Sequence, residues 1–314
     1  MEQNIISTTN NKIMRKLFIV ILLIITASTR ICAQLLYKIS GKDLDNPSYI
    51  IGTYHLAPAS FADSIAGLGN AMEQTEQVCG ELGMRQMIST ENTQKMGNAM
   101  LLPENTTLES ILSADEQARL NTFLRSLIGT DMTNPTVRQQ IGHMSPQALS
   151  TQFSLIMYMK QTPDFGPDNL FDEYFQKVAI EKGKPIIGLE TMDYQLKVLF
   201  HSMNIERQKQ LLMCLIDNSD YYNKITAKLI KAYFSQDINT VKTVMDEKQN
   251  TACDSTPQED ASLIYNRNTD WIRKIPVIMA DKATLFTVGT GHLPGCKGLL
   301  ALLRQAGYTV EAVK

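Results

Sequence analysis

Two short segments near opposite ends of the chain repeat one pattern around a histidine. They read Gly52-Thr-Tyr-His55-Leu and Gly289-Thr-Gly-His292-Leu, in a chain of 314 residues that has four histidines. Neutral imidazole is the commonest metal ligand in proteins, so a repeated histidine motif indicates a shared chemical task. Either histidine alone would be interpreted as a hydrogen-bonded structural residue, but the repeat predicts that His55 and His292 converge on one site.

A carboxylate that could complete such a site follows a neighbouring apolar segment. Glu81 ends the run that begins at Gln77, and we expect it to be the third ligand. Two imidazoles and one carboxylate leave coordination positions open for water and substrate. A divalent ion held in this way acidifies its bound water and polarises a carbonyl group. These residue types therefore predict a hydrolytic metal centre at His55, Glu81 and His292.

Short apolar runs bounded by turn residues predict the strands that would position this centre. The first two strands form a hairpin, and helical segments separate the later ones. Loops beyond the carboxyl ends of the strands form the ligand crevice of an open α/β sheet, and a glycine there lets the backbone turn sharply. Gly52 and Gly289 are placed for this purpose. The predicted strands cover residues 35–39, 48–52, 77–82, 185–189, 284–288 and 308–313.

The remaining sequence has the apolar spacing of helices. This spacing predicts that residues 84–184 and 191–275 are mostly helical, and that one helix covers residues 61–72. The expected fold class is α/β, with a central mixed sheet formed from N- and C-terminal strands, flanking helices, and a large helical insertion in the middle. We expect residues 34–314 to form a single domain.

The composition limits the classes of partner. The apolar content of 44% is enough for a large core, and the formal net charge is −2 without long runs of one sign. A chain of this charge has no basic surface of the kind that binds a phosphate backbone. We therefore expect a peptide or small-molecule substrate and no nucleic acid.

The N-terminus has the three-part layout of a secretory signal. Arg15 and Lys16 precede an apolar run over residues 17–27, and a short polar stretch then ends at Ala33. The run is shorter than the roughly 20 residues that a membrane span needs, so we expect residues 1–33 to be removed and no stable span to remain. The start at Met1 or at Met14 stays open. The expected location is periplasmic or secreted.

Export changes the interpretation of the cysteines. Removal of residues 1–33 would leave Cys79, Cys214, Cys253 and Cys296 in a compartment that permits disulfides. Cys214 and Cys253 lie in the same helical region and are the preferred pair. The alternative is that all four cysteines are buried free thiols.

Several common enzyme classes are excluded. The sequence has no Gly-x-Ser-x-Gly elbow, no His-Glu-x-x-His helix and no Walker loop. The last motif nearly spells a dinucleotide fingerprint, but Pro294 replaces its third glycine. His143 and His201 lie in helical surroundings without a repeated motif, so we interpret both as structural.

The residues around the two motifs resemble those of the TraB/GumN family. The resemblance rests on Gly-Thr-Tyr-His55-Leu, Glu81, Gly-Leu-Glu190-Thr, Arg267-Asn and the terminal Gly-Thr-Gly-His292-Leu-Pro-Gly segment. This family is related to the Tiki proteins, whose paired G-x-x-H motifs and glutamate are implicated in metal-dependent proteolysis, and it has fold relatives among the erythromycin esterase and ChaN-like proteins. The resemblance implies a divalent metal ion, with manganese or cobalt favoured over zinc.

The resemblance also assigns roles that the residue pattern leaves open. His55 and His292 match the family histidines, Glu81 the family acid, and Arg267 an arginine that would stabilise an oxyanion or orient Glu81. Glu81 could instead form a structural ion pair with Arg267, and Glu190 could complete a helix cap beside Thr191. The expected function is a metal-dependent hydrolase of the peptidase kind, and the alternative is a protein that binds a peptide or small molecule in the same crevice without turnover.

Overall fold

A computed structural model of the chain describes residues 34–83, 89–163, 165–166 and 170–314. The predicted signal at residues 1–33 lies outside these residues, as does the beginning of the first helical region at 84–88. Within the described residues, no helix is both long enough and apolar enough to cross a membrane.

All six predicted strands are present in one sheet, in the order β4-β3-β5-β2-β1-β6. The four strands β4, β3, β5 and β2 are parallel neighbours, β1 is antiparallel to β2 as the predicted hairpin requires, and β6 is antiparallel to β1. The sheet is therefore mixed, and its N- and C-terminal strands interleave. The strands are β1 Leu36–Ser40, β2 Ser48–Thr53, β3 Gln77–Gly80, β4 Ile186–Gly188, β5 Thr284–Gly289 and β6 Thr309–Ala312.

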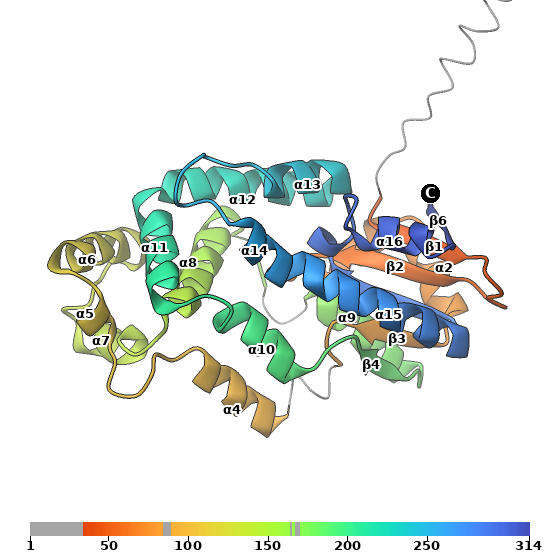
Figure 1. The fold of residues 1–314 in the computed structure, drawn as a ribbon, viewed down its shortest axis with the longest axis horizontal. Coiled ribbons are helices and arrows are strands. Elements are labelled where there is room, and N and C mark those ends of the chain that lie inside the picture. Colours follow the sequence, from red (N-terminus) through yellow and green to blue (C-terminus); the bar gives the residue numbers. More distant parts are fainter. Residues whose placement is uncertain (1–33, 84–88, 164, 167–169) are drawn as a thin grey trace, which may run out of the picture. The chain divides into compact units, whose positions relative to one another are not determined.

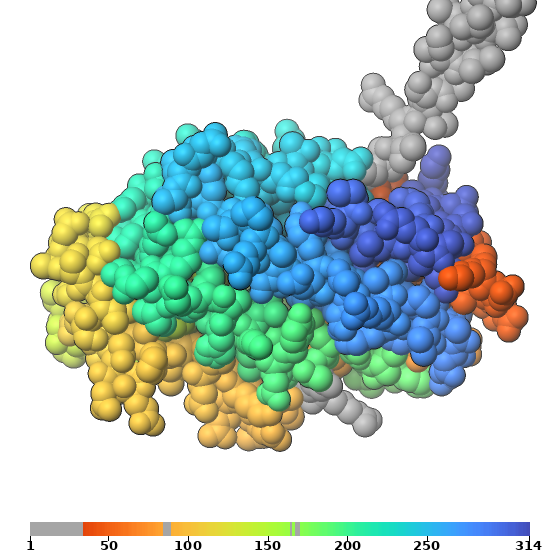
Figure 2. Space-filling model, viewed as in Figure 1, coloured from red at the N-terminus to blue at the C-terminus, as the bar shows by residue number. Residues whose placement is uncertain are grey.

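Burial explains why the central strands have few polar residues. Ile50 and Ile51 of β2 and Leu285 and Phe286 of β5 are fully buried. Consecutive apolar residues point to opposite faces of a strand, so both faces of the sheet must be covered, as is usual for parallel sheets. Figure 1 shows α9 and α15 beside the sheet, and Figure 2 shows red N-terminal and blue C-terminal residues meeting on the surface. The two ends of the described region thus build one core.

Two helical regions fill the middle of the chain, as predicted. The first helical region packs against the beginning of the second. Between them lies a separate apolar cluster that includes Phe123, Leu149 and Leu212. The helices are α4 Thr90–Ala99, α5 Leu108–Ile111, α6 Ala114–Ile128, α7 Pro135–Ile141, α8 Pro146–Gln161, α9 Phe171–Glu181, α10 Met192–Phe200, α11 Ile205–Asp217, α12 Ser219–Phe234, α13 Ile238–Met245, α14 Pro257–Asp260 and α15 Asn266–Asp281, with α16 Leu299–Gln305 near the C-terminus.

The single helix predicted over residues 61–72 is wrong. The segment contains a 3-10 helix, Ala59–Ser64, and a separate helix α2, Leu68–Gln74. Gly67 lies between them with a φ of +72°, a left-handed conformation that a continuous α-helix does not contain. The apolar spacing was real, but the backbone leaves the helical conformation between its two halves.

The preferred cysteine pair is confirmed. Cys214 of α11 and Cys253 of the loop after α13 form a disulfide, whereas Cys79 is buried and free and Cys296 is exposed and free. The bond joins residues 39 positions apart and holds the loop between α13 and α14 against the helical cluster.

Loss of this disulfide is expected to lower the free energy of unfolding by about 2–4 kcal/mol, because an unfolded chain without the cross-link gains loop entropy. The measurement is urea unfolding of the oxidised protein beside Cys214→Ala/Cys253→Ala. Cys296→Ala, which removes an exposed free thiol, is the control and should unfold like the parent. An unchanged unfolding midpoint in the double variant would show that the loop contributes nothing to global stability.

Candidate functional site

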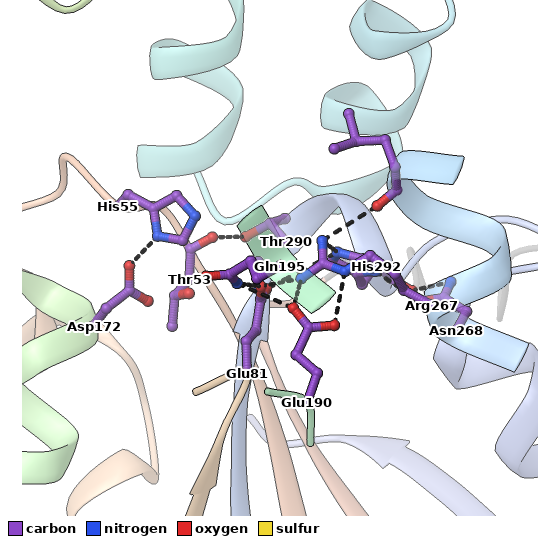
Figure 3. Close-up of polar contacts among 12 residues, drawn as sticks. Thr53, His55, Glu81, Asp172, Glu190, Gln195, Arg267, Asn268, Thr290 and His292 are labelled. Atoms are coloured by element: carbon purple, nitrogen blue, oxygen red, sulfur yellow. Dashed lines mark hydrogen bonds and ion pairs between the residues drawn. The ribbon is translucent and has the colours of Figure 1, made fainter. Parts of the chain in front are cut away.

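The sheet brings the expected site residues to one edge. Parallel neighbours end at the same edge of a sheet, and the order β4-β3-β5-β2 places four side chains there in sequence. Glu190 follows β4, Glu81 follows β3, His292 follows β5 and His55 follows β2. Figure 3 shows Glu81, Glu190 and His292 near Arg267, which comes from the first turn of α15, whereas His55 lies to one side beside Asp172. The two motifs therefore converge, as their repetition predicted.

All of these side chains except Glu190 line one pocket of about 390 Å³. His55, Glu81, Arg267 and His292 supply its charged and imidazole groups, and the carboxyl-terminal ends of β2 and β5 form its floor. Its walls come from the helical region: α10, α12, α13 and a π-helical turn, Ala261–Tyr265, that leads directly into α15. The helical insertion thus closes over the edge of the sheet.

Asn268 fixes the tautomer of His292. The Asn268 amide nitrogen donates to the carbonyl oxygens of His292 and Lys297 at 3.1 and 2.9 Å, so its oxygen faces the ring. That oxygen lies 2.7 Å from His292 Nδ1, which must carry the proton and donate it. Burial lowers the pKa of His292 to about 4, so the ring is neutral at pH 7. His292 Nε2 therefore presents a lone pair toward the pocket.

Asp172 orients His55 in the same way. The Asp172 carboxylate, at the beginning of α9, accepts a hydrogen bond from His55 Nδ1 (Figure 3). The carboxylate also raises the pKa of His55, so a cation binding at Nε2 would displace a proton. The His55 side chain is 72% exposed, whereas His292 is buried. His55 is thus the solvent-facing member of the pair.

Glu81 is held as a carboxylate by three donors. Its oxygens accept hydrogen bonds from the Gly289 N–H at 2.8 Å, from Gln195 Nε2 at 3.2 Å and from Arg267 Nη2 at 2.5 Å. Burial is the largest single influence and raises the pKa of Glu81, but the positive charge of Arg267, together with His292, His55 and the Gly289 N–H, outweighs it and lowers the pKa to about 2. The ion pair between Glu81 and Arg267, which was the alternative to metal ligation, is present.

Arg267 uses every N–H group it has. Nε and Nη2 donate to the two oxygens of Glu190 at 3.1 and 2.6 Å, and Nη2 also donates to Glu81. Nη1 donates to the Leu263 carbonyl oxygen and to His292 Nε2, at 3.2 and 3.1 Å. A guanidinium has five N–H groups, and all five are engaged. Of its two expected roles, this arrangement matches the orientation of Glu81, since no N–H is left for an oxyanion.

Glu190 does not cap a helix, so that alternative is wrong. The cap of α10 is made by Thr191, whose hydroxyl accepts from the Tyr194 N–H. The Glu190 carboxylate instead binds Arg267 and accepts a hydrogen bond from Gln195 at 3.1 Å. Its side chain is buried, and burial raises its pKa. Glu190 is therefore the structural partner of Arg267.

Gly52 and Gly289 allow close packing instead of the sharp turn that was expected. Neither has a positive φ. A Cβ atom at Gly52 would lie 2.8 Å from Thr290 Oγ1 and 2.9 Å from Leu293 Cδ1, and one at Gly289 would lie 3.2 Å from Glu81 Oε1. The glycines let the two motifs and Glu81 approach one another.

The donor atoms of His55, Glu81 and His292 are of the types that bind a divalent ion, but the three side chains do not lie close enough together to bind one. Glu81 Oε1 and His292 Nε2 are 3.9 Å apart, within the limit of about 4.2 Å for two ligands of one zinc-sized ion. The buried cluster has two carboxylates for one guanidinium, an excess of negative charge that favours a cation. Nevertheless, no three His, Cys, Asp or Glu side chains in the described part of the chain are close enough to hold an ion, and Arg267 donates to the His292 lone pair.

Several residues of the site were not found from the sequence. Asp172, Gln195 and Asn268 lie on three different helices, and each orients one of the expected groups. Only Asn268 had a sequence signal, because it adjoins Arg267. Trp271, one helical turn after Arg267, packs against His292 with ring centroids 4.4 Å apart and lies under the guanidinium of Arg267. His143 and His201, interpreted as structural, do not line this pocket.

Comparison with known proteins identifies a family and one distant relative. Residues 35–312 match the TraB/PrgY/gumN family. The chain is also similar to a metalloprotease TIKI homolog of Amphimedon queenslandica, with 20% identity over 305 residues that cover 84% of this chain and 59% of that protein. The chain therefore spans less than two thirds of this relative's length. No solved structure matches significantly. The match covers nearly all of the described sheet and both histidine motifs, and the chain belongs to the TraB/PrgY/gumN family.

Proposed function

We propose that this protein is a metal-dependent hydrolase that cleaves peptide bonds at the pocket between His55 and His292. The observation that carries the proposal is that each histidine has its Nδ1 engaged by a neighbouring oxygen, so that Nε2 is the nitrogen that would bind an ion; at His292 the ion would replace the Arg267 Nη1 donor. Carboxylate and carbonyl partners orient metal-binding histidines in this way. The similarity to a metalloprotease TIKI homolog supports the same reaction class.

His55, Glu81 and His292 would hold the ion, which would supply an acidified water and polarise the substrate carbonyl. Arg267 keeps Glu81 ionised and fixes its direction, and Gln195 and the Gly289 N–H restrict it further. Asp172 and Asn268 hold the two rings. Manganese and cobalt remain the favoured ions on the family resemblance.

A second candidate has its own observation. Arg267 Nη1 donates to His292 Nε2 at 3.1 Å, which gives the buried lone pair a partner within the protein. A histidine whose lone pair already accepts a hydrogen bond within the protein does not need a metal ion. Such a site is compatible with a protein that binds a peptide or small molecule without turnover. This candidate predicts binding that survives chelation.

We further propose that the protein acts outside the cytoplasm, in the periplasm or as a secreted protein. The N-terminal sequence has the layout of a secretory signal, and the Cys214–Cys253 disulfide suits an oxidising compartment. The free thiol of Cys79 is compatible with this, because it is buried and thus protected from oxidation.

The test compares metal content and peptide hydrolysis in matched histidine variants. The wild type is expected to bind about one divalent ion per chain and to hydrolyse a quenched fluorescent peptide library in a chelator-sensitive manner. His55→Ala/His292→Ala should lose both properties. His143→Ala/His201→Ala removes the other two histidines of the chain and should keep both. The metalloenzyme proposal fails if the wild type retains no more metal than the first double variant after reconstitution with manganese, cobalt or zinc.

A further inference from the structure

The pocket that contains the polar groups has mostly apolar walls. Its polar edge is formed by the strand ends, whereas the helices contribute six aliphatic or thioether side chains: Leu199, Leu229, Val241, Met245, Leu263 and Ile264. Three of these, Leu199, Met245 and Leu263, are 37%, 39% and 44% exposed. Large exposed apolar side chains gathered at the mouth of one pocket mark a binding surface, whereas scattered ones do not.

The apolar wall continues into a second cavity. This cavity, of about 360 Å³, shares Leu229 and Met245 with the first and extends along α8, α11 and the loop that contains Cys253. Met245 lies directly on the backbone beside His292, since a Cβ atom at Gly291 would be 2.8 Å from Met245 Cε. Methionine is flexible and adapts to different apolar shapes. Met245 and Leu229 thus form a deformable partition between two apolar compartments.

One buried hydroxyl in the pocket has no partner. Thr53 is 2% exposed and lines the pocket, yet its Oγ1 makes no hydrogen bond to any described residue. Its counterpart in the second motif is used internally: Thr290 Oγ1 donates to the Thr53 carbonyl oxygen at 2.8 Å (Figure 3). An unpaired buried hydroxyl costs free energy unless another group, such as one on a ligand, satisfies it. The two motifs therefore differ in that the Thr290 hydroxyl has a partner within the protein and the Thr53 hydroxyl has none among the described residues.

We propose that this pocket binds a peptide by an apolar side chain, and that Thr53 Oγ1 hydrogen-bonds the peptide backbone beside it. A mostly apolar pocket with a few fixed polar groups is the usual form of a specific ligand site. The excess carboxylate in the Glu81, Glu190 and Arg267 cluster disfavours an acidic side chain in the same place. The inference rests on the proposed function for its orientation toward the reacting groups, but peptide binding itself can be measured without turnover.

The test uses two labelled hexapeptides, Ala-Ala-Leu-Leu-Ala-Ala and Ala-Ala-Glu-Glu-Ala-Ala, whose binding is followed by fluorescence anisotropy. The host is the His55→Ala/His292→Ala protein, so that failed hydrolysis and failed recognition are separate results. The leucine peptide should bind at least tenfold more tightly than the glutamate peptide. Met245→Glu in this host should reduce that preference at least fivefold. Met96→Glu, which changes a similarly exposed methionine on α4, should leave it unchanged.

Thr53→Val is the decisive variant for the hydroxyl. Valine has nearly the shape of threonine, so removal of an unpaired hydroxyl should leave the melting temperature equal or higher while it weakens leucine-peptide binding about fivefold to tenfold. Equal affinity for both peptides, or an affinity that Met245→Glu leaves unaltered, would overturn the apolar subsite. A lowered melting temperature with unaltered binding would show that the hydroxyl is structural and would overturn its assignment.

Discussion

Replacing Arg267 with methionine is expected to lower the free energy of unfolding by about 3–5 kcal/mol, because two buried carboxylates would lose their cation. Glu81 and Glu190 both bind this guanidinium, and their remaining hydrogen bonds come only from uncharged groups. Methionine keeps an unbranched apolar side chain at this position but lacks the guanidinium that lies over Trp271. The loss would therefore reflect charge and hydrogen bonding, and urea unfolding at pH 7 is the measurement.

A second substitution distinguishes charge repulsion from lost packing. Glu190→Gln in the Arg267→Met background removes one of the two uncompensated charges, so the double variant should be more stable than the sum of the single effects by about 1–3 kcal/mol. Arg125→Met is the matched control, since Arg125 pairs with Asp131 but is 55% exposed, and it should cost less than about 1 kcal/mol. If Arg267→Met were as mild as this control, the buried cluster could not be the electrostatic centre described above.

Asp172→Asn is expected to weaken divalent metal binding about 10-fold to 100-fold, with a matching loss of peptide hydrolysis. The carboxylate can only accept a hydrogen bond, so it selects the His55 tautomer with the proton on Nδ1. An amide at the same position can donate, which allows the other tautomer and places the proton on the nitrogen that should bind the ion. Titration with manganese or cobalt, followed by calorimetry, measures the change.

Two controls make this prediction specific to His55. Asp115→Asn, at an exposed carboxylate that pairs with Arg119, changes the net charge equally and should not alter the affinity. Asn268→Leu removes the corresponding partner of His292 and should weaken metal binding in the same range. Parent-like affinity in Asp172→Asn would mean that His55 is not a ligand or that its ring is oriented by another group.

The sheet could be predicted because each of its strands has a clear local sequence pattern. Each combines a short apolar run with a turn residue at its end, and the fully buried β2 and β5 leave no alternative to a covered sheet. The repeated motif then predicted the convergence of His55 and His292. The position of Glu81, between Glu190 on one side and the two histidines on the other, depends on the strand order. That order follows from the pairing of β3 with both β4 and β5, which the sequence did not predict.

The supporting residues could not be predicted, because their roles depend on tertiary contacts. Asp172 near the beginning of a helix and Gln195 within one have ordinary local explanations, and nothing in the sequence links them to residues 117 and 114 positions away. The sequence also did not indicate that the Thr53 hydroxyl is unpaired. Thr290 occupies the same position of the repeated motif, yet its hydroxyl has a partner. At Gly67 the sequence pattern was misleading: regular apolar spacing predicted one continuous helix, although this residue has a left-handed conformation.

The strand order also governs when the site can first exist during synthesis. β5, at Thr284–Gly289, lies between β3 and β2, so the strands that deliver Glu81 and His55 have no direct pairing with each other. A nascent chain that ends before residue 284 lacks the central strand, and pairings across such long sequence separations form slowly. The site therefore cannot form before residues 284–292 have been synthesised, and a product that ends before them lacks both β5 and the second histidine motif.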